Sequence, residues 1–429
     1  MKKMHVGPAK NCKKTVNVQG DKSISHRAII IGSMAKGTTV VTNFLEAEDT
    51  LNTIKVYREL GVKIEKIKDK YYIHGRGAGA LRQSPETLDV GNSGTSIRLT
   101  IGVLSAKNFT SVITGDNQIV KRPMARVMEP LILMGAKFES NQGKSPVIIH
   151  GGTLKGIEYK MPMASAQVKS AVMLAALSAR GKTVIKEPVV SRDHTERMLK
   201  YFGAPITQSK GLITIKPGKE MKAKPVFVPG DISSAAYFII AGLMMKNSVI
   251  KIKNVGLNPT RVGLIEVMKK MGGKIKITGV KIKNNEPIGD IIASTSKLKG
   301  ITIGGAMIPK LIDEIPVIAV AAAFATGKTI IKDAKELRFK ETDRIQTVVK
   351  NLNRIGIKAE ELPDGMIIHG NGGLPFKYAD IDSFSDHRIA MAFSVAALSG
   401  ENGLLIKDVE CVNTSFPDFF EIMKKLSVK

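Results

Sequence analysis

Apolar and polar positions along the chain form a block that recurs six times. Each block holds a helix of small residues, a tight turn, a strand and a second helix ending near a glycine, as in SMAKGTTVVTNF followed by YRELGVKIE. Further copies begin at VLSAKNFTSVITG, ALSARGKTVIKEP, LMMKNSVIKIKN, AFATGKTIIKDA and ALSGENGLLIKD. The copies are roughly 65–80 residues apart, which is longer than the repeats of solenoid proteins. Helical and strand-like stretches alternate, so the pattern predicts six mixed α/β units.

A short polar segment precedes one helix of every unit. The six segments read QGDKSISHRAII, VGNSGTSIRLT, MPMASAQVKSAVM, VPGDISSAAYF, PKLIDEIPVIAV and FSDHRIAMAF. They are rich in Ser, Asp and Asn, which cap helix N-termini. Helix N-termini present free N–H groups and the positive end of the helix dipole, so converging helices would bind anions. For VPGDISSAAYF we prefer the interpretation of an ordinary cap.

Chain length and charge narrow the class of protein. A chain of 429 residues exceeds the usual size of one domain, which predicts two domains. The formal net charge is +27, but the lysines are scattered, aromatic residues make up 5% and there is no Trp. Nucleic-acid binding needs clustered basic charge or stacking platforms, so we expect a basic surface that attracts small anions, and no nucleic acid partner.

Several kinds of site and location are disfavoured. The chain start has no apolar segment typical of a signal peptide, and the apolar stretch at 315–325 is too short to span a bilayer, which predicts a cytoplasmic protein without membrane contact. Two cysteines and seven histidines without ligand spacing predict no disulfide framework, no metal and no cofactor. The GKT sequences at Gly181 and Gly327 lack the earlier glycine of a P-loop, so we interpret both as repeat turns.

Eight segments, in order, resemble the enolpyruvyl transferases, and among them the 3-phosphoshikimate 1-carboxyvinyltransferase (EPSP synthase) family. They are GDKSISHR, GNSGTSIRLT, KRPMARV, MASAQVKSA, LIDEIPV, LRFKETDR, SDHRIAMA and TSFPDFF. The resemblance implies an α/β fold of two domains, built from six βαβαββ-type repeats as inside-out barrels, with the active site in the interdomain cleft. It places domain I at 1–20 plus 230–429 and domain II at 21–229.

The resemblance also implies the reaction. The enolpyruvyl group of phosphoenolpyruvate is transferred to the 5-hydroxyl of shikimate 3-phosphate, through a tetrahedral ketal, with release of phosphate. The product leads to chorismate and the aromatic amino acids. A monomer that uses these two substrates and no cofactor is expected.

Candidate residues are carried over from the matching segments. Lys22, Asp313 and Glu341 are the expected catalytic residues: Asp313 is the base for the 5-hydroxyl, and Glu341 passes a proton to and from the methylene carbon. The residues expected to bind phosphoenolpyruvate are Lys22, Asn92, Gly94, Thr95, Arg122, Gln167, Arg344 and Arg388. Those expected to bind shikimate 3-phosphate are Lys22, Ser23, Arg27, Ser165, Ala166, Gln167, Ser191, Asp313 and Lys340, with Arg192 as an alternative to Ser191.

The chain departs from the family pattern at two of these positions. Ala166 stands where many members have a second Ser, and Thr414 stands where many have a Lys, which puts one phosphate contact and one lysine contact in doubt. Gly94 leaves room where members that resist glyphosate often carry an Ala. We therefore expect glyphosate to inhibit in competition with phosphoenolpyruvate.

Two other functions compete. The sister enzyme that acts on UDP-N-acetylglucosamine typically has Lys-Asn where this chain has Lys22-Ser23, and a reactive Cys in the loop that here reads DNQIVKRPM. An RNA 3′-end-processing protein of related architecture would suit the charge. It would also need a nucleotide site and an adenylated nucleophile, and the sequence indicates neither.

Overall fold

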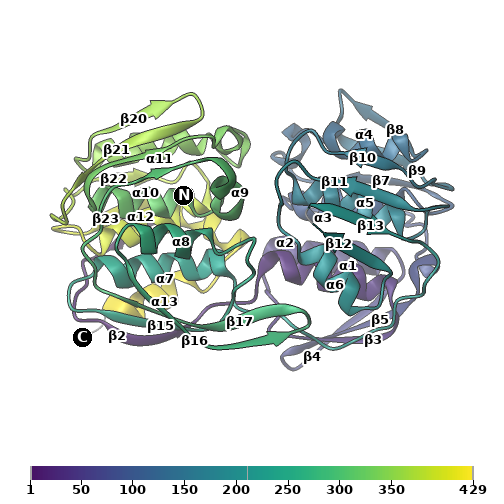
Figure 1. Ribbon diagram of the computed structural model, residues 1–429, viewed down its shortest axis with the longest axis horizontal. Helices are drawn as coiled ribbons and strands as arrows, with labels where there is room; N and C mark the ends of the chain where they lie inside the picture. Colours follow the sequence, from purple (N-terminus) through teal and green to yellow (C-terminus); the bar gives the residue numbers. More distant parts are fainter. Residues whose placement is uncertain (1, 210, 428–429) are drawn as a thin grey trace. The chain divides into compact units, whose positions relative to one another are not determined.

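The computed structural model describes residues 2–209 and 211–427, which form two compact units (Figure 1). Unit 1 consists of Met1–Gln19, Pro229–Ile282 and Pro287–Lys429, and unit 2 consists of Gly20–Val228 and Lys283–Glu286. The chain therefore passes between units near residues 20 and 229, and again at both ends of Lys283–Glu286. The sequence analysis did not anticipate that last segment.

The described part of unit 2 contains three four-stranded sheets, with orders β14-β3-β5-β4, β6-β7-β9-β8 and β10-β11-β13-β12. The strands are β3 (Lys36–Thr42), β4 (Lys63–Ile67), β5 (Lys70–Arg76), β6 (Leu88–Asp89), β7 (Thr110–Thr114), β8 (Lys137–Asn141), β9 (Lys144–His150), β10 (Glu158–Lys160), β11 (Thr183–Lys186), β12 (Ile206–Ser209), β13 (Leu212–Ile215) and β14 (Val226–Phe227). The helices are α1 (Lys22–Met34), α2 (Glu48–Glu59), α3 (Gly94–Leu104), α4 (Ala125–Leu133), α5 (Ala166–Ala176) and α6 (His194–Tyr201), with short 3₁₀ helices η1 (Ala78–Ala80) and η2 (Ile119–Lys121).

Unit 1 repeats this plan, again counting only described residues, with sheet orders β16-β17-β15-β2, β18-β19-β21-β20 and β1-β23-β22. Its strands are β1 (Lys3–Val6), β2 (Lys13–Asn17), β15 (Val249–Gly256), β16 (Lys274–Lys283), β17 (Glu286–Ser294), β18 (Thr302–Ile303), β19 (Thr326–Ile331), β20 (Ala359–Leu362), β21 (Gly365–Asn371), β22 (Asp380–Asp382) and β23 (Leu404–Lys407). Its helices are α7 (Ile232–Met244), α8 (Gly263–Lys270), α9 (Ile308–Leu311), α10 (Ile315–Phe324), α11 (Arg344–Arg354), α12 (His387–Ala397) and α13 (Phe419–Ser427), with 3₁₀ helices η3 (Gly305–Met307), η4 (Lys335–Phe339) and η5 (Val409–Thr414).

The six predicted repeats are confirmed, and two of them exchange a strand. β2 leads into α1 but pairs in parallel with β15, whereas β14 leads into α7 but pairs in parallel with β3. In each unit, one sheet therefore includes an edge strand from the segment beside a chain crossing between the units: β2 in unit 1 and β14 in unit 2. The last repeat is completed by the beginning of the chain, because β1 pairs antiparallel with β23.

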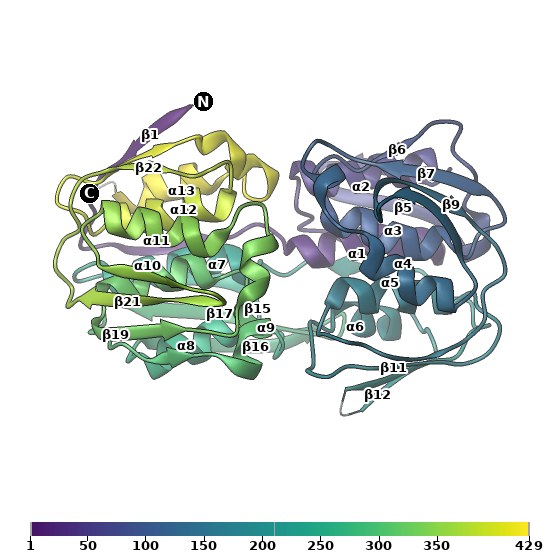
Figure 2. The same ribbon diagram turned by 90° about the horizontal axis from the view of Figure 1, so that it is seen from above.

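Helices fill the centre of each unit, and the sheets lie around them (Figures 1 and 2). In unit 1, α7, α10 and α12 pack on one another, and nearly all of their residues are buried. Such helices are apolar on every side, as core helices must be. In unit 2, α3 packs on α5 so closely that a Cβ at Gly102 would lie 2.3 Å from the Ala171 carbonyl oxygen. Glycine is required at this crossing.

The predicted caps explain where these core helices begin. Side chains cap five of the six by accepting a hydrogen bond from a backbone N–H of the first turn: Asp21, Ser93, Ser165, Asp231 and Asp386. The sixth, α10, begins with Pro316 in its first turn and follows the short helix α9. None of the helices described is long and apolar enough to cross a membrane.

Candidate active site

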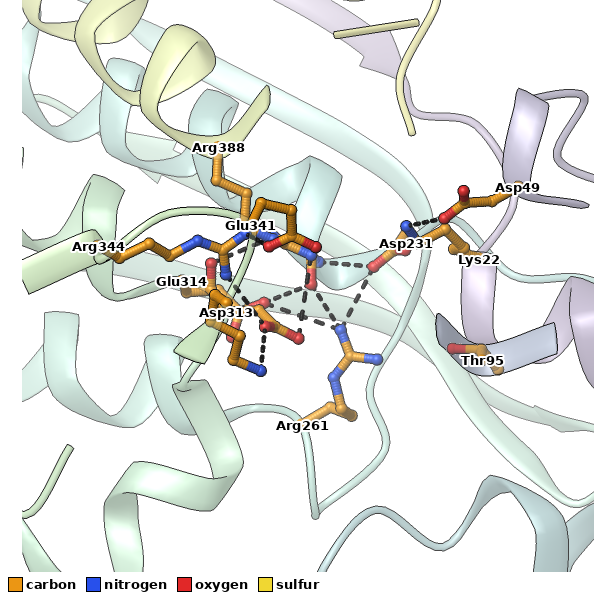
Figure 3. A network of polar contacts seen from close by, with 12 residues as sticks. Lys22, Asp49, Thr95, Asp231, Arg261, Asp313, Glu314, Glu341, Arg344 and Arg388 are labelled. Atoms are coloured by element: carbon orange, nitrogen blue, oxygen red, sulfur yellow. Dashed lines mark hydrogen bonds and ion pairs between the residues drawn. The ribbon is translucent and has the colours of Figure 1, made fainter. Parts of the chain in front are cut away.

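Arg344 lies at the centre of a cluster of charged side chains in unit 1. It is the first residue of α11, and its side chain is buried. Nε donates to Asp386 Oδ2 at 2.8 Å, and Nη2 donates to Glu341 Oε2 at 2.5 Å. Nη1 lies 3.6 Å from Asp313 Oδ1 (Figure 3). Burial alone would lower the pKa of Arg344, but the carboxylates of Asp386 and Glu341 raise it above its ordinary value, so this arginine stays charged.

Asp313 stands just before α10 and is surrounded by cations. Its Oδ1 lies 3.4 Å from Lys340 Nζ, and its Oδ2 lies 3.9 Å from Arg388 Nη2. Arg388 Nη1 also donates to the Asp313 backbone carbonyl at 3.2 Å, which fixes the main chain there. Burial opposes the charge of Arg388, yet the nearby Asp313 carboxylate raises its pKa above the ordinary value. Cations therefore lie beside both carboxylate oxygens of Asp313, the residue expected to act as the base.

Glu341 and Lys340 are the members of the cluster that solvent reaches most easily. They lie between η4 and α11, and their side chains are 22% and 28% exposed. A small molecule can therefore contact this ammonium and this carboxylate, while Arg344 holds the carboxylate from the buried side. Five predicted residues, Asp313, Lys340, Glu341, Arg344 and Arg388, are thus together in one cluster.

In unit 2, the first turn of α1 presents Lys22. Its Nζ lies 2.7 Å from Asp49 Oδ2, a partner on α2. One turn on, Arg27 is buried, and burial lowers its pKa to about 10, so it remains charged at neutral pH. Arg27 donates to the Ser23 carbonyl at 2.9 Å and to Thr195 Oγ1 at 2.7 Å. These hydrogen bonds fix Lys22, Ser23 and Arg27 at the beginning of one helix.

A second group of predicted residues lies around the beginning of α3. Arg122 Nη2 donates to Asn92 Oδ1 at 3.3 Å, and Gln167 Nε2 donates to Thr95 Oγ1 at 3.2 Å. A Cβ on Gly94 would lie 3.1 Å from Arg122 Nη1, which is tighter than ordinary contact. Glycine therefore lets the guanidinium approach the helix N-terminus, where an anion is favoured.

The beginning of α5 and the segment after β11 carry three more of the predicted residues. Ser165 and Ala166 lie at the beginning of α5, and Ser191 lies in the segment after β11. Ser165 Oγ accepts from Val168 N at 3.4 Å and caps α5, so its side chain lies at the helix N-terminus. Ala166 is the first residue of that helix and is half-buried. Ser191 Oγ donates to Glu187, a residue that the sequence analysis did not single out.

A model of the family EPSP synthase (3-phosphoshikimate 1-carboxyvinyltransferase) matches residues 6–423. The chain belongs to the EPSP synthase family. It is 52% identical over 415 residues to a 3-phosphoshikimate 1-carboxyvinyltransferase of Thermoanaerobacter sp. strain X514, covering 96% of this chain and 97% of that one. The corresponding protein of Petrotoga mobilis is 49% identical over 429 residues, with 99% of both chains covered. A solved structure of EPSP synthase from Acinetobacter baumannii matches with a TM-score of 0.90 and 44% identity, covering 100% of this chain and 98% of that chain.

The family match confirms the predicted fold and enzyme class, but the sequence analysis missed several charged residues beside the predicted ones, among them Asp49, Arg98 and Arg261. Asp49 pairs with Lys22, as given above. Arg98, one turn after Gly94, donates from Nη1 to Gln167 Oε1 at 2.7 Å. Its place in GTSIRLT, one helical turn from the predicted loop, was the available signal.

Arg261 is the third of these residues, and it stabilises the segment that carries Asp313. Its buried guanidinium donates to Ser233 Oγ at 2.6 Å and lies 3.8 Å from Glu314 Oε1. Ser233 Oγ in turn donates to Glu314. Because Glu314 follows Asp313 directly, this network fixes the beginning of α10.

Three further features of the sequence can be located in the structure. Gly181 has φ +88° just before β11, as expected for a turn, whereas Gly327 has φ +87° within β19 and is paired with Gly370 of β21, so the second GKT sequence lies in a strand. Thr414 ends η5, and its Oγ1 donates to the Cys411 carbonyl at 2.8 Å. Among the residues described, no group of three or more His, Cys, Asp or Glu is arranged to hold a metal ion.

Proposed function

We propose that this enzyme transfers the enolpyruvyl group of phosphoenolpyruvate to the 5-hydroxyl of shikimate 3-phosphate and releases phosphate. The observation that carries the proposal is the cluster of Asp313, Lys340, Glu341, Arg344 and Arg388 in a chain of this family. The cluster supplies a base, an acid and three cations, each within hydrogen-bonding or ion-pairing distance of at least one other member. The reaction needs all of these groups.

In the addition step, Glu341 protonates the methylene carbon of phosphoenolpyruvate, and the 5-hydroxyl oxygen attacks the neighbouring carbon. The hydroxyl proton passes to Asp313. The product of this step is the tetrahedral ketal, in which the former methylene is a methyl group. Arg344, 2.5 Å from Glu341, keeps that carboxyl group in place while its charge changes.

In the elimination step, the bond from the ketal carbon to the phosphate oxygen breaks. Glu341 removes a proton from the methyl group, and the proton held by Asp313 leaves with the phosphate. All atoms and charges are then accounted for, since Glu341 is again the protonated acid and Asp313 is again the carboxylate. Lys340 stabilises Asp313 throughout, since the two groups are 3.4 Å apart.

The remaining residues bind the two substrates. In unit 1, Arg344 and Arg388 present guanidinium groups to phosphoenolpyruvate, which has one carboxylate and one phosphate. In unit 2, Arg122, Asn92, Gly94, Thr95 and Gln167 bind phosphoenolpyruvate at the beginning of α3. Shikimate 3-phosphate is bound by the residues at the beginning of α1 and α5, with Ser191.

The test is phosphate release from phosphoenolpyruvate with two acceptors in parallel. We expect release with shikimate 3-phosphate and none above background with UDP-N-acetylglucosamine, and we expect EDTA to leave the rate unchanged. Release only with the nucleotide sugar would contradict the proposal. The monomeric state and the cytoplasmic location stay predictions.

A further inference from the structure

The segment from Glu187 to Glu196 comprises the connection after β11 and the first residues of α6, and it carries Ser191 and Arg192. Residues 187–193 form neither helix nor strand. No helix or sheet hydrogen-bond pattern fixes residues 187–193, so side-chain contacts contribute strongly to the conformation of this segment. It is of functional interest because Ser191, with Arg192 as the alternative, is among the residues proposed to bind shikimate 3-phosphate.

Lys169, on α5, contacts this segment at its beginning, middle and end. Its Nζ lies 2.9 Å from Glu187 Oε2 and 2.6 Å from Glu196 Oε1, and it donates to the Ser191 carbonyl at 3.4 Å. The Lys169 side chain is fully buried. A lysine in the protein interior is rare unless it is paired, and here it pairs with two carboxylates.

Glu187 extends the effect of Lys169 to the rest of Ser191. Glu187 Oε1 accepts from the Ser191 backbone N–H at 3.2 Å and from the Ser191 hydroxyl. The backbone N–H, the carbonyl and the hydroxyl of Ser191 are therefore all held by Lys169, either directly or through Glu187.

The charge of Lys169 also affects the Ser191 hydroxyl hydrogen. A substrate phosphate must compete with Glu187 for that hydrogen, because both groups are anionic acceptors. Lys169 neutralises Glu187 and so weakens its hold on the hydrogen. Without this cation, the carboxylate would hold the hydroxyl more strongly and would repel the phosphate.

We propose that Lys169 is a positioning residue for shikimate 3-phosphate, acting through Glu187 on the Ser191 hydroxyl and main chain. The inference rests on the proposed function. It adds to that function a residue that does not touch the substrate but decides how well the phosphate is bound.

A second buried lysine in unit 2 provides a matched control. Lys107 is also buried, but its Nζ donates to the Ala78 carbonyl at 2.7 Å and not to the segment at 187–196. Its loss should affect folding stability without affecting the phosphate. A general effect of removing an interior lysine would appear in both variants.

The experiment measures the Kd of shikimate 3-phosphate by calorimetry and the KM of both substrates, below the melting temperature of each variant. For Lys169→Met we expect the Kd and KM of shikimate 3-phosphate to rise at least about tenfold, with the KM of phosphoenolpyruvate within about twofold of wild type. Lys107→Met should leave both KM values unchanged. Adding Glu187→Gln to Lys169→Met should restore part of the affinity, because the repelling carboxylate is gone.

An unchanged Kd in folded Lys169→Met, an equal rise in both KM values, or no recovery in the double variant would overturn the inference. If Lys169→Met does not fold, Lys169→Arg retains the charge but places a larger, planar group against Glu187. A Kd about threefold higher in that variant supports the inference, and an unchanged Kd overturns it. If the wild-type enzyme releases no phosphate with shikimate 3-phosphate, it is the proposed function that fails.

Discussion

The clusters around Arg344 in unit 1 and Lys169 in unit 2 both place a buried cation among carboxylates, yet they differ in exposure. Arg344 is 1% exposed, but its partners Glu341 and Asp313 are 22% and 14% exposed. Lys169 and Glu187 are both 0% exposed, and Glu196 is 3% exposed. The partly exposed carboxylates can exchange protons with a bound molecule, whereas the enclosed ones can only fix the chain around them.

This contrast predicts different kinetic effects. Changes in the Arg344 cluster should alter the chemical step, and changes around Lys169 should alter affinity. Burial raises the pKa of Glu196, and the neighbouring Lys169 charge counteracts that rise. The role of Lys169 is therefore electrostatic support, and no proton transfer is assigned to it.

The largest effect is expected for Glu341→Gln. Glutamine retains the shape and the contact with Arg344 but cannot transfer a proton, so kcat should fall about 100- to 10,000-fold. The Kd of shikimate 3-phosphate, measured by calorimetry, should change less than about threefold. Glu360→Gln, at an exposed position on β20, is the control and should have wild-type kcat. A wild-type kcat in Glu341→Gln would exclude this residue as the proton carrier.

Arg122→Lys extends the comparison to binding at the beginning of α3. Lysine retains the charge but loses the planar fork that binds carboxylate or phosphate through two N–H groups. A charged hydrogen bond contributes about 1.5–3 kcal/mol, so the KM of phosphoenolpyruvate should rise about 10- to 100-fold. Steady-state kinetics with each substrate varied in turn measures this. If only the KM of shikimate 3-phosphate rises, Arg122 is wrongly assigned.

Gly94→Ala should have a smaller effect at the same place. The added methyl would lie 3.1 Å from Nη1 of both Arg122 and Arg98, so the guanidinium groups must shift. Overpacking costs about 1–3 kcal/mol, and we expect the KM of phosphoenolpyruvate to rise about tenfold and glyphosate to inhibit less. Gly79→Ala is the control, because nothing lies within 4 Å of its added Cβ. Equal glyphosate titration curves for wild type and Gly94→Ala would contradict this prediction.

The smallest expected effect on catalysis is that of Lys107→Met, which should change stability alone. Burial lowers the pKa of Lys107 from 10.5 to about 8. Between these values the unfolded chain binds more protons than the folded one, so this group makes the free energy of unfolding rise with pH. Between pH 8 and 10.5 the free energy of unfolding should rise by about 3 kcal/mol because of this group. Urea titrations at pH 7.5 and 10.5 measure the rise in the wild type, and it should be absent from Lys107→Met. Parallel pH dependences in the two proteins would show that Lys107 is not the group responsible.

The sequence predicted the local features of the fold well, because these depend on neighbouring residues. The small-residue helices, the glycine turns and caps such as Ser93 and Asp386 follow from spacing and residue type. The exchange of β2 and β14 between repeats did not follow. Each of these strands pairs with a strand about 200 residues away in the sequence. Such pairing depends on which sheet offers a free edge, and the residue pattern of β2 or β14 does not specify that.

For the candidate site, too, residues in recognisable segments could be named from the sequence, and residues defined by distant contacts could not. Residues in matching segments, such as Asp313 and Glu341, could be named from the resemblance, and the structure places them together. Arg261 and Lys169 could not be named from the sequence. A buried cation is recognised by partners that lie far away in the sequence, and without knowledge of those partners a lysine or arginine is interpreted as a surface residue. The same is true of Glu286, whose carboxylate lies 2.7 Å from His194 although 92 residues separate them.

The most direct test of the account is the reaction of wild-type enzyme in D₂O, with the product's vinyl group examined by mass spectrometry and proton NMR. Glu341 would deliver deuterium to the methylene carbon, and the ketal's methyl group would then lose either hydrogen or deuterium. The account predicts product molecules with one deuterium in the vinyl methylene, formed in a constant proportion to the phosphate released, and neither signal above background in Glu341→Gln. Full turnover by the wild type with no deuterium in that position would contradict protonation at carbon, and with it the role given to Glu341.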